Sequence, residues 1–167
     1  MDPLTARLQN WLGPVVERVS TVALARWGLG LMLVLAGVHK LIAPEAWAVY
    51  VTDWLAPWLV VSPRLFMLLN GPPEILVGGL LLADRYVAPA TAVAAVSLPA
   101  TVAYLAVVAV TSGAFVDVLI RDVGLTALAW VVLLDALEAE NDLLRERVEA
   151  IENHIAGTTG DEAVADD

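Results

Sequence analysis

Long apolar stretches separated by short polar ones make up most of this chain. They cover about residues 21–42, 60–83, 86–111 and 114–136. Each is long enough to cross the roughly 30 Å hydrocarbon core of a bilayer as a helix. Because most connections are short, the pattern predicts an all-α fold, an integral membrane four-helix bundle of up-down topology, in a domain formed by residues 21–137.

Two further segments have one apolar face at helical spacing. Residues 1–20 form the first, with a break at Gly13-Pro14. The second lies in the connection 44–58, where the apolar series is Trp47, Tyr50, Val51, Trp54, Leu55 and Trp58. Pro44 and Glu45 suit the first turn of a helix, and tryptophan favours the lipid headgroup level. Both segments are predicted to be interfacial amphipathic helices; the alternative for the second is an aromatic box that binds a ligand.

The segment 138–156 is predicted to be a cytoplasmic helical tail. It continues a heptad seam from the fourth stretch, formed by Leu134, Leu137, Asn141, Leu144, Val148, Ile151 and Ile155. In a parallel homodimer, Glu140 would face the partner's Arg145, and Arg147 would face the partner's Glu152; an asparagine at position a favours dimers. The alternative is a lone amphipathic helix that packs on residues 4–19. We expect the acidic segment 157–167 to be disordered.

A helix break is predicted near the middle of the second stretch, at Gly71, Pro72 and Pro73. The prolines lack the backbone N–H groups that would bond the carbonyls of Leu68 and Leu69. An unwound turn at membrane depth must be buried in protein or line a polar cavity. Glu74 follows immediately, so we expect the other helices to pack around its carboxylate.

The apolar stretches contain more charges than helix packing requires, which indicates a buried polar site. Its candidate residues are Glu74, Arg121, Asp122, Arg26, Lys40 and Arg64. From the helix rise of about 1.5 Å per residue, Glu74 is expected to reach Arg121 or Arg26, and Asp122 to reach Arg64 or Lys40. Charges inside a membrane are functional hypotheses. Two alternatives stay open: ion pairs that only fix helix packing, and, for Lys40, a side chain that extends to the membrane surface.

Composition narrows the chemistry. The chain is 59% hydrophobic with a net charge of −10, and its excess of acids lies mostly after Glu138. This argues against nucleic acid as a partner. No cysteine is present, which excludes thiol chemistry and iron–sulfur clusters, and the two histidines lie far apart, so no metal site is predicted. Acid-rich composition with Lys40 as the only lysine favours a halophilic source.

Arginine and lysine placement predicts the orientation in the cell membrane. Five arginines (Arg7, Arg18, Arg85, Arg145 and Arg147) flank one side of the predicted bundle, against Lys40 and Arg64 on the other. By the positive-inside rule, both termini are expected to be cytoplasmic.

The pattern resembles the DoxX family of small four-span membrane proteins. The resemblance is carried by Arg26–Gly30 and Ala36–Leu41 in the first stretch, Glu74–Gly79 in the second and Arg121–Leu125 in the fourth. It implies association with quinone- or thiosulfate-linked membrane redox systems, with Arg26, Lys40, Glu74, Arg121 and Asp122 as the polar set. Pro72-Pro73 and the tail depart from the family pattern.

Three functions follow as hypotheses. The first is an accessory subunit of a membrane redox complex, whose site around Glu74 holds a quinone headgroup or relays a proton. Since the chain has no intrinsic redox cofactor, a redox partner subunit would supply electrons, and a stand-alone enzyme is not indicated. The second is a non-catalytic scaffold in the lipid bilayer that dimerises through its tail. The third is a proton or small-solute carrier.

Overall fold

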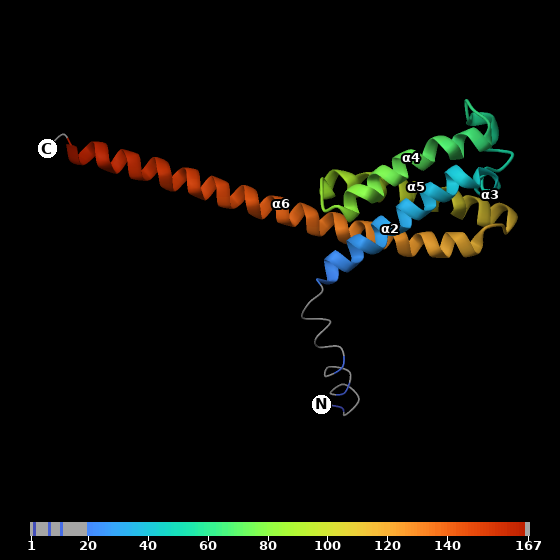
Figure 1. The fold of residues 1–167 in the computed structure, drawn as a ribbon, viewed down its shortest axis with the longest axis horizontal. Helices are drawn as coiled ribbons and strands as arrows, with labels where there is room; N and C mark the ends of the chain where they lie inside the picture. The colour runs from blue at the N-terminus through green and yellow to red at the C-terminus, as the bar shows by residue number, and fades with distance from the viewer. Residues whose placement is uncertain (1, 3–6, 8–10, 12–19, 166–167) are drawn as a thin grey trace. The chain divides into compact units, whose positions relative to one another are not determined.

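The computed structural model describes residues 2, 7, 11 and 20–165, with side chains up to His154. The described part of the chain is helical and contains no strand. Its elements are α2 (Thr21–Ile42), α3 (Pro44–Ala48), the short 3₁₀ helix η1 (Ala56–Trp58), α4 (Pro63–Leu82), α5 (Val87–Ser112) and α6 (Val116–Ala165) (Figure 1). The all-α prediction is confirmed. The predicted helix within residues 1–20, and the alternative that the tail packs on it, lie outside the described residues.

Local sequence signals set the helix ends. Ser20 and Ser62 cap α2 and α4, because each hydroxyl accepts a hydrogen bond from the backbone N–H three residues later. Pro63 occupies the first turn of α4, where its missing N–H has no cost. Gly113, with φ of 72°, closes α5 in the left-handed conformation that glycine adopts without strain.

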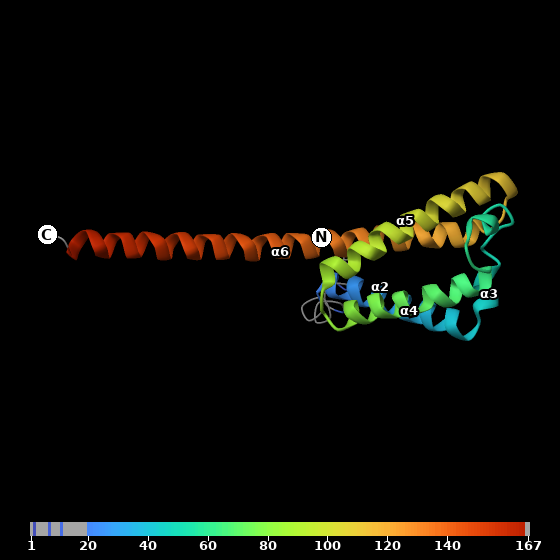
Figure 2. The same cartoon turned by 90° about the horizontal axis from the view of Figure 1, so that it is seen from above.

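The chain divides into two units, Met1–Leu133 and Leu134–Asp167. In the first unit, α2 and α4 form one layer, and α5 with the first part of α6 forms another (Figure 2). Buried side chains from both layers share one core, which includes Leu29, Leu81, Ala94, Ala129 and Val132. Apolar residues from all four stretches therefore contribute to one core.

Two glycine pairs set the contact between α2 and α4. A Cβ at Gly78 would lie 2.5 Å from the carbonyl oxygen of Gly30, and a Cβ at Gly37 would lie 2.6 Å from that of Gly71. Only residues without a side chain allow two helix backbones to approach this closely. Because both pairs are seven residues apart, the two antiparallel helices stay in contact for about two turns.

Three helices in the described part of the chain, α2, α4 and α5, are long and apolar enough to cross a membrane. The sequence predicted a fourth at 114–136. Helix α6 begins there, but residues 116–133 already contain three charges, Asp117, Arg121 and Asp122. The fourth stretch thus differs from the others in polarity, although it contributes to the same core.

The predicted break in α4 is wrong. The helix continues through Gly71, Pro72 and Pro73 without interruption. Proline has a backbone φ suited to a helix, so its cost comes from the lost hydrogen bond and from steric crowding. Both proline rings are exposed, away from α2, while Gly71 is buried against Gly37. The close contact with α2 therefore holds α4 together on the side opposite the prolines.

The single interfacial helix predicted at 44–58 is also wrong. Pro44 and Glu45 start α3 as expected, but this helix ends at Ala48, and only η1 is helical further on. The Tyr104 hydroxyl of α5 donates to the Tyr50 carbonyl (2.6 Å) and accepts from the Thr52 N–H (3.1 Å). These two backbone groups are consequently engaged by α5 and not by a helix of their own.

Removing the two hydrogen bonds of the Tyr104 hydroxyl should lower the stability of the protein. Tyr104→Phe leaves both backbone groups of the connection without their partner, and we expect a loss of about 1–3 kcal/mol in the free energy of unfolding. Tyr86→Phe is the control, because Tyr86 is 75% exposed. Denaturant titration of the purified protein, followed by tryptophan fluorescence, measures both; equal stabilities of the two variants would contradict the role of Tyr104.

The second unit consists of the continuation of α6. The helix extends to Ala165, so it passes Gly157, where the sequence predicted disorder to begin. On the described residues of the tail, the seam residues Leu144, Val148 and Ile151 are each more than half exposed.

Candidate functional site

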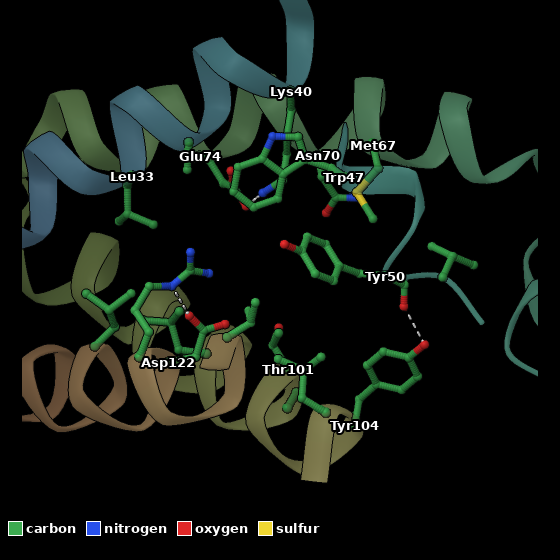
Figure 3. Close-up of a pocket in the computed structure, with 18 of the residues that line it drawn as sticks. Leu33, Lys40, Trp47, Tyr50, Met67, Asn70, Glu74, Thr101, Tyr104 and Asp122 are labelled. Carbon is green, nitrogen blue, oxygen red and sulfur yellow. Dashed lines mark hydrogen bonds and ion pairs between the residues drawn. The ribbon is translucent and has the colours of Figure 1, made fainter. Parts of the chain in front are cut away.

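A partly open cavity of about 370 Å³ lies inside the first unit, between its two layers. It is found at the end of the unit that contains α3. Its walls come from the second half of α2, the first turns and the middle of α4, the middle and second half of α5 and the first turns of α6. The connection between α2 and α4 covers it. Figure 3 shows charged and aromatic side chains converging on this space.

An ion pair from α2 and α4 forms one wall. Lys40 Nζ pairs with Glu74 Oε1, and Lys40 is only 7% exposed. The same ammonium group lies 4.3 Å from the centre of the Trp47 ring, within the range of a cation–π interaction. Lys40 therefore does not extend to the surface; its charge is held inside the protein by a carboxylate and an aromatic face.

Glu74 has unused hydrogen-bonding capacity. Its second oxygen, Oε2, is buried and is without a hydrogen-bond partner among the described residues. A buried acceptor in this condition costs free energy unless a ligand or water supplies a donor. Since Glu74 lines the cavity, this oxygen is available to a group bound there.

A second ion pair comes from α6. Arg121 Nε donates to Asp122 Oδ1 at 2.8 Å, and Asp122 is 5% exposed while the Arg121 side chain is 53% exposed. Only Nε of the guanidinium makes a hydrogen bond within the described chain. Both residues line the cavity, so the remaining Arg121 donors provide positive charge and N–H groups on the wall opposite Glu74.

Aromatic residues of the connection complete the site. Trp47 Nε1 donates to His39 Nδ1 at 2.8 Å, which fixes the indole beside Lys40. The Tyr50 ring packs edge-on against Phe115, with centroids 4.9 Å apart, and Figure 3 shows its hydroxyl directed into the cavity. The sequence analysis placed Trp47 and Tyr50 on an interfacial helix, with an aromatic box for a ligand as the alternative; in the structure both residues line the cavity.

The structure brings together four of the six predicted polar residues, Glu74, Lys40, Arg121 and Asp122. The predicted pairings are wrong. Glu74 pairs with Lys40 and not with Arg121 or Arg26, and Asp122 pairs with its neighbour Arg121. Helical side chains lean toward the N-terminus of their own helix, so on antiparallel helices Lys40 and Glu74 lean toward each other.

The other two candidates lie outside the cavity. Arg26 pairs with Asp84 at the opposite end of α2. Arg64 pairs with Glu45 at 2.6 Å, and both side chains are more than 60% exposed. The hydrogen bond from Arg64 lowers the pKa of Glu45 below its ordinary value. Neither pair contributes to the candidate site.

Across the described residues, no group of three or more histidine, cysteine, aspartate or glutamate side chains is placed to hold a metal ion. The lining of the cavity offers carboxylate oxygens of Glu74 and Asp122, guanidinium donors of Arg121, the Tyr50 hydroxyl, and aromatic and apolar side chains. Such a combination suits a flat, uncharged molecule with oxygen atoms at its edges.

No protein-family model, curated protein or solved structure matches this chain.

Proposed function

We propose that this chain is a four-span membrane protein whose cavity binds a quinone headgroup, and that it serves as a DoxX-like accessory subunit of a membrane redox system. One observation carries the proposal: a cavity between apolar helices contains two ion pairs and a buried carboxylate oxygen without a partner. Charged side chains inside a membrane cost free energy, and proteins retain them mainly at functional sites.

Exposed apolar side chains support the membrane part of the proposal. Val96 is 72% exposed and Val110 is 87% exposed on α5, and Leu24 is 61% exposed on α2. Apolar surface on this scale is expected where lipid replaces water as the surrounding medium. Residues 116–136 of α6 would provide the fourth span, in which Arg121 and Asp122 line the cavity, whereas Asp117 and Asp135 are exposed near its two ends.

The arrangement of basic residues supports an orientation. Arg26 and Arg85 mark the end of the spans away from the cavity, and the positive-inside rule places this end at the cytoplasm. Both termini are then cytoplasmic, and the cavity lies in the outer half of the membrane.

The cavity residues fit a quinone by their donors and acceptors. Arg121 N–H groups can donate to a quinone carbonyl oxygen, and Glu74 Oε2 can accept a hydrogen bond from the hydroxyl of the reduced form. Apolar side chains such as Met32, Leu33 and Leu98 offer a path for an isoprenoid tail. A bound quinone supplies two-electron redox chemistry. The chain itself holds and orients the headgroup and excludes water, while a partner subunit delivers electrons.

Purification in a mild detergent tests the proposal. We expect quinone to co-purify with the wild-type protein, and Glu74→Gln to retain less than about a tenth of it, as the loss of a charged hydrogen bond worth about 1.5–3 kcal/mol predicts. Glu45→Gln is the matched control, since Glu45 is a paired carboxylate outside the cavity. Chromatography of the extracted lipids measures the bound quinone; absence of quinone in the wild type, or equal amounts in all variants, contradicts the proposal.

A milder variant separates binding from stability. Tyr50→Phe removes a hydroxyl that makes no hydrogen bond in the described chain and should reduce bound quinone several-fold without weakening the fold.

The carrier hypothesis relied on a broken helix, and α4 is continuous. Proton uptake into liposomes that contain the protein alone would nevertheless favour a carrier over an accessory subunit.

A further inference from the structure

The tail of α6 has an apolar face that nothing in the described chain covers. Four of its side chains, Leu137, Leu144, Val148 and Ile151, are between 41% and 60% exposed. Successive members are seven, four and three residues apart. Asn141 lies between the first two, and with it the series has the alternating spacings of four and three that define a heptad seam. In heptad terms Asn141 and Val148 are a positions, and the other three are d positions.

A shallow hollow on this face has the composition of a coiled-coil hole. It is lined by Asn141, Leu144, Arg145, Val148 and Glu149. In a parallel two-stranded coiled coil, a d side chain inserts between two a residues, one d residue and the adjacent e residue of the facing helix. Asn141, Val148, Leu144 and Arg145 are that set, so the hollow would receive the partner's Leu144.

We propose that a second copy of this chain occupies the face and forms a parallel two-stranded coiled coil through residues 137–151. The flanking charges are complementary for this arrangement. Glu140, at position g, would face the partner's Arg145 at position e, and Arg147 would face the partner's Glu152. These arginines and acids lie on an exposed helix surface, where they can meet without desolvating a core.

Asn141 favours this pairing over other associations. In a parallel dimer, the two asparagines meet at one a layer and can hydrogen-bond each other. In an antiparallel pair, Asn141 would instead face the partner's Ile151, which offers no hydrogen-bond partner. A single buried asparagine is the best-attested determinant of dimer register, at some cost in stability.

Only about two heptads are involved, which is marginal for helices free in solution. Two tails anchored in one membrane, or in one detergent micelle, have an effective concentration in the millimolar range. This gain in effective concentration rests on the proposed membrane insertion, but the pairing of the tails does not require quinone binding.

Single-cysteine cross-linking tests the dimer, because the chain has no cysteine of its own. Leu144→Cys should form a disulfide-linked dimer under mild oxidation in detergent. Leu143→Cys is the matched control: Leu143 and Leu144 are adjacent leucines, 57% and 58% exposed, but only Leu144 lies on the seam. We expect at least tenfold more dimer from Leu144→Cys; equal yields from the two variants, or no dimer, would overturn the proposal.

Two further variants test orientation and charge. A mixture of Asn141→Cys and Ile151→Cys proteins should give each homodimer and little heterodimer, whereas preferred heterodimer would contradict the parallel arrangement. Arg145→Glu should lower the yield of the Leu144→Cys dimer severalfold, because it opposes the partner's Glu140, and adding Glu140→Arg should restore it. Loss of the dimer with quinone still bound rejects this inference alone; loss of quinone with the dimer intact rejects only the proposed function.

Discussion

Gly78→Ala is expected to destabilise the protein by about 3 kcal/mol, the upper end of the range for overpacked sites. The new methyl group would lie 2.5 Å from the carbonyl oxygen of Gly30 and 2.8 Å from the backbone nitrogen of Val34. Backbone atoms cannot rotate away as a side chain can, so α2 and α4 must separate. Thermal unfolding in detergent, followed by circular dichroism, measures the loss.

The adjacent glycine provides the control for this substitution. A Cβ at Gly79 would meet nothing within 4 Å, and alanine is the better helix former by about 1 kcal/mol. Gly79→Ala is therefore expected to leave the stability unchanged or to increase it. If the two variants unfolded at the same temperature, close contact at Gly78 would not hold the helices together.

Replacing Glu74 is expected to cost about 3–5 kcal/mol, because the buried Lys40 charge is left without a counterion; replacing Lys40 should cost less, since the Glu74 side chain is 27% exposed. The effect on the double variant Lys40→Met/Glu74→Met is expected to be much smaller than the sum of the two single effects, since no unpaired charge remains. Denaturant titration of all four proteins measures the coupling between the two residues.

An exposed ion pair serves as the comparison. Arg64 and Glu45 also form a hydrogen-bonded pair, but their side chains are 62% and 69% exposed. Glu45→Met should change the stability by less than about 1 kcal/mol, as is typical of surface pairs. A similar cost at both pairs would mean that the Lys40–Glu74 pair is not effectively buried.

Helix positions could be predicted from the sequence because they follow from local patterns. The predicted range 21–42 matches α2, and the predicted range 86–111 differs from α5 by one residue at each end. The course of α4 through Pro72 and Pro73 could not be predicted in this way. It depends on the contact between Gly71 and Gly37, two residues far apart in the chain.

Four of the six predicted polar residues do line the cavity, but Arg26 and Arg64 do not, and the contacts of the four were not predicted. Residue types and depth were sufficient to select Glu74, Lys40 and Asp122, because charges within apolar stretches are rare and easily found. Their partners depend on the direction in which each side chain leans and on the rotation of each helix about its axis. The estimated depth of a residue in the membrane contains neither kind of information. Tyr50 was not assigned to the site because contacts with residues distant in the sequence bring its segment over the cavity, among them the hydrogen bond from Tyr104 and the ring contact with Phe115.

That hydrogen bond ties the part of the connection around Tyr50, which covers the cavity, to α5. Loops between helices usually move independently of their neighbours, yet here the stretch around Tyr50 is fastened to α5 beyond Pro99, the point where this helix lacks a backbone hydrogen bond. Any bending of α5 at Pro99 would move the segment around Tyr50 together with the part of α5 that follows Pro99. Access to the interior would then depend both on the angle of this proline-containing helix and on the contacts by which Trp47 and Glu45 hold the same connection to α2 and α4.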